Sequence, residues 1–196
     1  MSKLASNIKE SKLVLLGSST VGKSSIAVRL TREMFLENST ATIGASFMSK
    51  TFEVNGIQVK LQIWDTGGAE RYRAMAPMYF HDANAAIIIY DVCSKNTFED
   101  VSSWLKELRE KGPNDIYIGL AGNKIDLADR RIVSTNEGQE YARANGIHVF
   151  KEVSALTGEN VNSLFSSIAE LLSKGQPFRR PSVDITICEE KRKQCC

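Results

Sequence analysis

A glycine-rich turn between an apolar run and a helical pattern constrains this chain more than any other stretch. The turn spans residues 17–24, reads GSSTVGKS and follows the apolar run 13–16. This G-x-x-x-x-G-K-[ST] pattern between strand and helix is typical of a phosphate-binding loop, whose backbone N–H groups point at phosphate oxygens. Lys23 can reach terminal phosphates, and the Ser24 hydroxyl can ligate Mg²⁺. The alternative is a glycine-rich turn that merely precedes a lysine.

Apolar runs and helical patterns alternate along the rest of the chain. Strands are expected at residues 12–16, 46–54, 57–64, 85–90, 116–121 and 147–153, and helices at 23–34, 97–111, 135–144 and 161–172. Asn55-Gly56 is a strong hairpin signal, so the second and third strands are expected to be antiparallel. Segments 1–10, 35–45 and 66–81 are expected to be irregular. The alternation predicts an α/β domain on a largely parallel sheet.

Length and composition suit one soluble domain with tails. The chain has 196 residues, of which 42% are hydrophobic and 24% are charged. We expect a flexible N-terminus at residues 1–9, a domain at 10–173 and a disordered tail at 174–196. A net charge of +2 without a basic stripe argues against nucleic acid.

The cysteines and the apolar stretches predict a reducing compartment and no membrane span. Three of the four cysteines lie in the last nine residues, and none has zinc-ligand spacing. A disulfide framework is therefore not expected. The N-terminus has no apolar run of signal-peptide length, and the longest apolar stretch, residues 85–90, is too short to cross a bilayer.

A second motif, Asp65-Thr66-Gly67-Gly68, follows the third expected strand. Ligand-binding loops of open α/β sheets lie at such strand ends. Asp65 can hold the water shell of Mg²⁺, and Gly68 can offer its N–H to a terminal phosphate. Alone this D-x-x-G pattern is weak and fits a simple turn, but beside a phosphate loop it indicates the metal end of the site.

A third motif, Asn123-Lys124-Ile125-Asp126, follows the buried strand predicted at residues 116–121. A buried carboxylate at Asp126 can accept the N1–H and the exocyclic amino group of guanine, a donor pair that adenine lacks. Lys124 can lay its stem along the base. Ser154-Ala155, at the tip of the next strand, can add a backbone N–H to the guanine carbonyl oxygen. Alone, N-K-x-D is common in solvated loops.

These motifs together resemble the Ras superfamily of small GTPases over residues 10–173. Segments 42–47 (TIGASF), 70–73 (ERYR) and 76–79 (APMY), with the terminal Cys195-Cys196, resemble the Rab family, and most closely the endosomal Rabs. The resemblance implies the G-domain fold, an α/β structure with a six-stranded, mostly parallel sheet and five helices. It also implies a monomer that binds GTP, GDP and Mg²⁺ and acts as a switch in vesicle traffic.

The resemblance assigns roles to individual residues. Thr42 would close onto Mg²⁺ and the γ-phosphate, and Gly68 would donate its N–H to that phosphate, so that its loss releases both switch segments. Phe35 would pack against guanine, although it also fits a core position at a helix end. Three aromatics, Phe47, Trp64 and Tyr79, would face effectors, whereas composition alone favours the core for them. The implied nucleotide-binding residues are Ser18, Ser19, Thr20, Val21, Gly22, Lys23, Ser24, Ser25, Phe35, Thr42, Gly68, Asn123, Lys124, Asp126, Ser154, Ala155 and Leu156.

The sequence departs from the family pattern in the second motif and directly after Ser154-Ala155. Where the family has D-T-A-G-Q-E, this chain has Asp65-Thr66-Gly67-Gly68-Ala69-Glu70. The methyl group of Ala69 cannot orient the attacking water as glutamine does, so slow intrinsic hydrolysis is expected while Lys23, Thr42 and Gly68 remain. The alternatives are an engineered change, a partner that supplies the missing group, and a GTP-binding module with negligible hydrolysis. Leu156 replaces the usual lysine.

The expected tail has its own implied chemistry. Cys195-Cys196 resembles the Rab ending, which implies two geranylgeranyl groups and a stable membrane anchor, whereas the alternative is two unmodified thiols.

The resemblance further implies effectors, an exchange factor, a GTPase-activating protein, a Rab escort protein and a GDP-dissociation inhibitor as partners. The implied location is the cytoplasm and the cytosolic face of endosomal or vesicle membranes. A P-loop kinase or ATPase is disfavoured by the guanine-type motif at residues 123–126.

Overall fold

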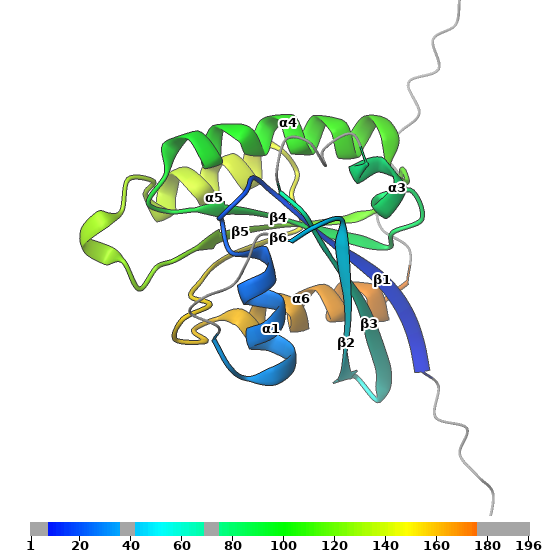
Figure 1. Ribbon diagram of the computed structural model, residues 1–196. Coiled ribbons are helices and arrows are strands. Elements are labelled where there is room, and N and C mark those ends of the chain that lie inside the picture. The colour runs from blue at the N-terminus through cyan, green and yellow to red at the C-terminus, as the bar shows by residue number, and fades with distance from the viewer. Residues whose placement is uncertain (1–7, 36–41, 69–74, 176–196) are drawn as a thin grey trace, which may run out of the picture.

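The computed structural model describes residues 8–35, 42–68 and 75–175, and its centre is a six-stranded sheet. The strand order is β2-β3-β1-β4-β5-β6, in which β2 and β3 are antiparallel and all other neighbours are parallel (Figure 1). The strands are β1 (Ile8–Leu16), β2 (Ala45–Val54), β3 (Ile57–Thr66), β4 (Ala85–Asp91), β5 (Tyr117–Asn123) and β6 (Val149–Val153). The predicted six-stranded, mostly parallel α/β sheet is confirmed.

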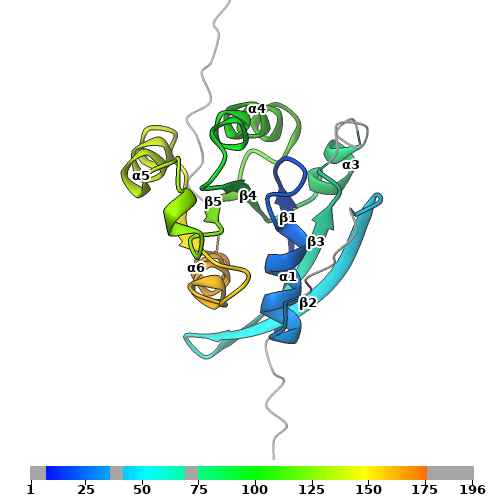
Figure 2. The ribbon, with the colours of Figure 1, turned by 60° about the vertical axis from the view of Figure 1, so that its left-hand side comes forward.

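Five α-helices of the described residues cover the two faces of the sheet (Figures 1 and 2). They are α1 (Lys23–Arg32), α3 (Ala76–Phe80), α4 (Lys95–Lys111), α5 (Thr135–Ala144) and α6 (Val161–Ser173), with a 3₁₀ turn at Ala128–Arg130. One hydrophobic core lies under α1 and α6, and a second lies under α3, α4 and α5. No helix within the described ranges is long and apolar enough to cross a membrane.

Local signals place several element boundaries where the sequence predicts them. The hairpin between β2 and β3 turns at Asn55 and Gly56, both with positive φ (52° and 76°), as an Asn-Gly turn requires. Helix α5 begins and ends at the predicted residues, and its start is fixed by a capping box in which the Ser134 hydroxyl accepts the Glu137 N–H and the Glu137 carboxylate accepts the Ser134 N–H. The run in β4 is buried, as expected for a strand covered on both faces.

The structure differs from the sequence prediction where long-range contacts decide. Strand β1 begins at Ile8 rather than residue 12, because its polar start pairs with β3 and Glu10 binds both Lys60 and Gln62 at 2.8 Å. The segment expected to be irregular up to residue 81 contains α3, whose Phe80 is buried in the second core. Helix α1 ends two residues early, since Glu33 takes a left-handed backbone conformation (φ 57°).

Candidate nucleotide-binding site

The phosphate loop joins β1 to α1 and needs glycine at both of its ends. A Cβ on Gly17 would lie 2.2 Å from the Ile89 carbonyl oxygen, and one on Gly22 would lie 2.3 Å from Asn123 Nδ2. Both glycines have positive φ (135° and 98°), which side chains rarely adopt. Between them, Ser19 and Thr20 are exposed at the rim of the loop. The chain therefore curls tightly here before α1 begins at Lys23.

Lys23 is buried against this loop, with only 5% of its surface exposed. Its Nζ donates to the Gly17 and Ser18 carbonyl oxygens at 2.8 Å each. Burial lowers the pKa of Lys23 to about 8, although nearby Asp65 opposes the shift. A Cβ on Gly68 would lie 2.3 Å from Nζ, so the backbone of Gly68 passes directly beside the ammonium group. The structure thus brings the first and second motifs into contact.

Three oxygen-bearing side chains converge at the start of α1. The Ser24 hydroxyl donates to Asp65 Oδ2 at 2.5 Å and shares a hydrogen bond of 2.8 Å with the Thr42 hydroxyl. Asp65 is 1% exposed, and its Oδ1 is buried without a hydrogen-bond partner in the described part of the chain. Burial raises the pKa of Asp65, and the bond from Ser24 is the main opposing influence.

This cluster fits Mg²⁺. Hydroxyl and carboxylate oxygens are ligands that Mg²⁺ accepts, and it commonly binds proteins through one or two such groups, waters and phosphates. The unpartnered Asp65 Oδ1 is a buried acceptor that a cation or its water can satisfy. Groups of three or more His, Cys, Asp and Glu residues able to hold a metal do not occur within residues 8–35, 42–68 and 75–175.

Asn123 links the phosphate loop to the turn after β6. It is 1% exposed, its Nδ2 donates to the Val21 carbonyl at 2.8 Å, and its Oδ1 accepts the Ala155 N–H at 3.1 Å. The sequence pattern singles out Asn123 without indicating this bridge. The sequence also predicts that a backbone N–H of Ser154-Ala155 faces guanine. In the structure the Ala155 N–H instead donates to Asn123 Oδ1.

The two charged residues of the third motif lie at the mouth of the site. Asp126 is exposed rather than buried as expected, and its Oδ1 accepts a hydrogen bond from the Ser154 hydroxyl. The same hydroxyl accepts the Thr157 N–H at 3.0 Å, so Asp126 is tied to the turn after β6. Lys124 pairs with Asp91 Oδ2 at 2.7 Å.

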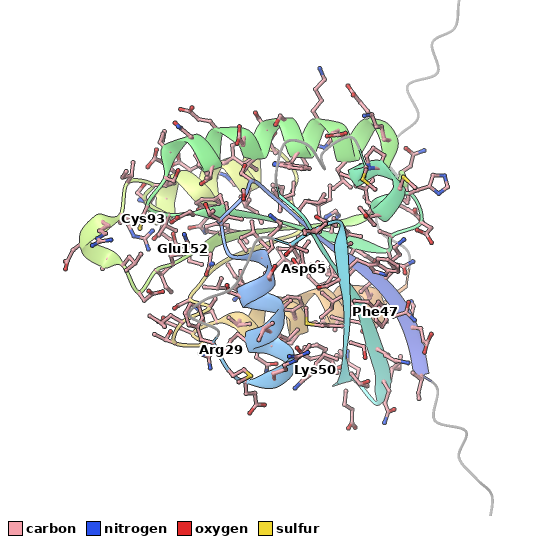
Figure 3. All side chains as sticks on the ribbon, viewed as in Figure 1. Arg29, Phe47, Lys50, Asp65, Cys93 and Glu152 are labelled. Atoms are coloured by element: carbon pink, nitrogen blue, oxygen red, sulfur yellow. The ribbon has the colours of Figure 1, made fainter. Side chains whose placement is uncertain are left out.

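Two residues that the motifs do not include hold the site together. Arg29 lies on α1 (Figure 3), and its guanidinium donates to the Ala155, Leu156 and Glu33 carbonyl oxygens. Asp100 on α4 accepts a hydrogen bond of 2.7 Å from the Ser18 hydroxyl. The bonds of Arg29 to Ala155 and Leu156 and of Asp100 to Ser18 have no local sequence signal, because these partners lie 126, 127 and 82 positions away. Only the folded chain brings them together.

Phe35 is partly buried and packs on the core beneath α1 and α6, as its alternative role at a helix end requires.

The three aromatics of the implied effector face form one cluster. The Phe47 and Trp64 rings meet edge-on at 5.7 Å, and the Trp64 and Tyr79 rings lie 6.3 Å apart. Phe47 is 55% exposed, so the core position favoured by composition is wrong for it (Figure 3).

The remaining predicted site residues divide between described and undescribed segments. Ser25 is half-buried in the first turn of α1, and Leu156 is exposed. The Gly67 N–H donates to the Gly44 carbonyl at 2.7 Å, which joins the segments that carry Thr42 and Gly68. Ala69, Cys195 and Cys196 lie outside the described residues.

Comparison with known proteins found a matching family and similar chains. The chain matches the family model described as the Ras family over residues 12–174. It is 47% identical to Ras-related protein Rab-5A of Dictyostelium discoideum over 191 residues, which cover 94% of each chain. It is 44% identical to Ras-related protein RHN1 of Nicotiana plumbaginifolia over the whole of both chains, and 46% identical to Ras-related protein Rab5 of Nicotiana tabacum over 90% of this chain and 88% of the relative.

Proposed function

The chain belongs to the Ras family of small GTPases, and we propose that it is a Rab-type switch that recruits effectors in endosomal vesicle traffic. The observation that carries the proposal is the convergence of Lys23, the Ser24–Thr42–Asp65 cluster and the Asn123 bridge at one edge of the sheet. The endosomal assignment is supported by relatives named Rab-5A and Rab5.

At the phosphate end, burial prepares the protein groups for an anionic ligand. Lys23 Nζ is held by two loop carbonyls and can exchange them for phosphate oxygens without a large movement. Ser24, Thr42 and Asp65 would hold Mg²⁺, which supplies charge neutralisation on the terminal phosphates. The curled loop adds backbone N–H groups, and the positive end of α1 lies directly behind it.

The switch couples the third phosphate to the surface. Thr42 and Gly68 lie beside the phosphate loop, and their segments are joined by the bond between Gly67 and Gly44. A γ-phosphate that engages Thr42 and Gly68 draws both segments inward, and its loss releases them. The cluster of Phe47, Trp64 and Tyr79 adjoins these segments and presents the nucleotide state to effectors.

Exposed apolar side chains around this cluster support a protein-binding role for it. Ile43 is 78% exposed and Met78 is 73% exposed, and both lie close in sequence to members of the cluster. Exposed apolar side chains that gather in one patch mark interaction sites in soluble proteins, and the closeness in sequence of Ile43 to Phe47 and of Met78 to Tyr79 supports such a patch here. In this proposal effectors bind that surface, while an exchange factor, a GTPase-activating protein, a Rab escort protein and a GDP-dissociation inhibitor act on the same GTPase.

Intrinsic hydrolysis is slow in this proposal, because the methyl group of Ala69 can neither orient water nor contact the developing charge. A second candidate, a GTP-binding module with negligible hydrolysis, is favoured by the same residue. Binding itself does not depend on Ala69, since the phosphate, metal and base contacts come from other residues.

Single-turnover GTP hydrolysis by the wild type and the Ala69→Gln variant tests the proposal. The variant is expected to hydrolyse GTP at least about tenfold faster, because one positioned polar group commonly contributes 10² or more to such a step. GDP dissociation, measured as the matched control, should be equal in both proteins. Equal hydrolysis rates would contradict a role for Ala69. A wild-type rate at background level, with the purified protein carrying mostly GTP, would favour the second candidate.

The tail anchors the protein in this proposal. Cys195 and Cys196 carry geranylgeranyl groups, since two lipid chains give stable binding where one is marginal. The anchor places the GTPase on the cytosolic face of endosomal or vesicle membranes. Mass spectrometry of the protein from its own cells should show two added lipids, and replacing both cysteines by serine should move the protein to the soluble fraction. An unmodified tail in cells would contradict the anchor.

A further inference from the structure

One side chain of α1 spans the gap between that helix and the turn after β6. Arg29 Nε donates to the Ala155 carbonyl at 2.9 Å, and its Nη2 donates to the Leu156 carbonyl at 2.5 Å. Its Nη1 donates to the Glu33 carbonyl at 2.9 Å, which ties the guanidinium to the end of its own helix. The planar fork of arginine is suited to hold two neighbouring carbonyls in one fixed geometry.

The turn after β6 is therefore held by hydrogen bonds on two sides. On its inner side the Ala155 N–H is bound by Asn123 Oδ1, and the Thr157 N–H is bound by the Ser154 hydroxyl, which also binds Asp126. On its outer side both carbonyls point at Arg29. The peptide group between Leu156 and Thr157 is thus held at both ends, and the one between Ala155 and Leu156 is held at its carbonyl, in a turn that contains the residues expected to face guanine.

The orientation of one free amide follows from the planarity of the peptide bond. In a trans peptide the N–H of one residue points opposite to the carbonyl of the residue before it. Because the Ala155 carbonyl points at Arg29, the Leu156 N–H points away from Arg29 and toward the side of the turn where Asn123 and Asp126 lie. The guanine base is expected on that side.

We propose that Arg29 is a positioning residue for base recognition: by holding the Ala155 and Leu156 carbonyls it presents the Leu156 N–H to the carbonyl oxygen at C6 of guanine. The inference rests on the proposed guanine-nucleotide function. Adenine carries an amino group at C6, so a fixed N–H donor there opposes it and adds to the selectivity of Asp126. The backbone provides the contact, which explains why an exposed leucine is tolerated at residue 156.

Helix α1 then connects the two ends of the nucleotide. Its first turn carries Lys23 and Ser24 at the phosphates and the metal, and Arg29 reaches the base side from the next turns. Gly158 lies beside the arginine stem, since a Cβ on Gly158 would be in van der Waals contact with Arg29 Cδ at 3.4 Å. A change at Arg29 is therefore expected to affect the base contact and leave the phosphate contacts in place.

Dissociation of a fluorescent GDP from the full chain tests the inference. The Arg29→Ala variant is expected to release GDP about tenfold faster, the loss of roughly one positioned hydrogen bond. Arg29→Lys should lie in between, because a single ammonium cannot fork onto both carbonyls. Arg32→Ala, which removes an exposed arginine three residues along the same helix, is the matched control and should stay within about twofold of the wild type.

The diphosphate of 2-aminopurine riboside separates positioning of the base contact from a general loss of structure. This analogue keeps the 2-amino group but lacks the oxygen at C6, so Arg29→Ala should change its dissociation by less than about twofold. Equal acceleration of both nucleotides, or an Arg29→Ala rate equal to that of Arg32→Ala, would overturn the inference. A wild-type protein that fails to retain GDP would instead contradict the proposed function itself.

Discussion

At the scale of single residues, burial sets the chemistry of the two charges at the phosphate end. Lys23 and Asp65 are both almost fully buried, and burial lowers the pKa of the lysine to about 8 and raises that of the carboxyl group. The Lys23 ammonium and the Asp65 carboxylate are therefore each less stable than in water, although their mutual attraction offsets part of this cost. A phosphate beside Lys23 and a cation beside Asp65 would each supply an oppositely charged partner for a buried charge.

Asp126 is the residue whose replacement should most directly change base recognition. Asp126→Asn keeps an oxygen to accept the Ser154 hydroxyl but loses the charge and one acceptor for guanine. We expect the dissociation constant for GDP to rise about 100-fold, since hydrogen bonds to charged groups contribute about 1.5–3 kcal/mol each. Isothermal titration with GDP measures it. Weak ADP binding should be unchanged, and unaltered GDP affinity would exclude Asp126 from the base contact.

At the scale of elements, helix α5 shows how one residue can give a helix a pH-dependent stability. The side-chain hydrogen bond with Lys95, followed by the bonds with Ser134, lowers the pKa of Glu137 to about 2. Because this value is below that of the unfolded chain, the stabilisation is complete above about pH 4.5 and is lost as the pH falls toward 2. The group is solvent-exposed, so salt should weaken the effect.

The Glu137→Gln variant tests this pH dependence. Glutamine can still complete the capping box but carries no charge to pair with Lys95. The midpoint of thermal unfolding should be lower in the variant than in the wild type at pH 7, and the difference should vanish as the pH approaches 2. A difference that stays constant between pH 7 and pH 3 would contradict a charge-based contribution.

The bridge made by Asn123 joins the ends of β1, β5 and β6. Asn123→Ala leaves the Val21 carbonyl and the Ala155 N–H without their partner in a buried place. We expect the free energy of unfolding to fall by about 2–3 kcal/mol, the usual cost of such unpaired groups. Urea denaturation measures it, with Asn136→Ala on the exposed face of α5 as the control. A loss no larger than the control's would show that the bridge contributes little.

At the scale of the whole molecule, the site is assembled from separate parts of the chain. The loop after β1, the segment before β2 and the ends of β3, β5 and β6 all contribute to it. The loops after parallel strands meet at one edge of the sheet, because all those strands run in the same direction. A ligand held by all of these segments opposes any opening that separates them.

Nucleotide should therefore stabilise the entire domain. A ligand at 1,000 times its dissociation constant contributes about 4 kcal/mol. For a chain of this size we expect the thermal midpoint to rise by about 8–16 °C when GDP and Mg²⁺ are added to nucleotide-free protein. Differential scanning calorimetry measures this, with ADP and Mg²⁺ as the control and chelation of Mg²⁺ as a second arm. Equal midpoints with GDP and ADP would contradict guanine-specific binding.

Local physics determined much of this protein from its sequence alone. The glycines of the phosphate loop, the Asn-Gly turn and the capping box of α5 depend on neighbours within a few residues, so their patterns predict them. The apolar runs in β4 and β5 predict buried strands, because transfer of apolar side chains out of water is favourable in any fold. Together with the spacing of the motifs, these signals were enough to predict the sheet, whereas the roles assigned to the site residues stay predictions.

Tertiary structure decided what depends on residues far apart in the chain. Only pairing with β3 makes a strand of the exposed segment Ile8–Glu10, and only packing against the second core makes a helix of Ala76–Phe80. The bonds of Arg29 to the turn after β6, of Asp100 to Ser18 and of Asn123 to Val21 join partners 82 to 127 positions apart, for which no local pattern exists. Burial, which shifts the pKa values of Lys23 and Asp65, likewise exists only once the chain has folded around them.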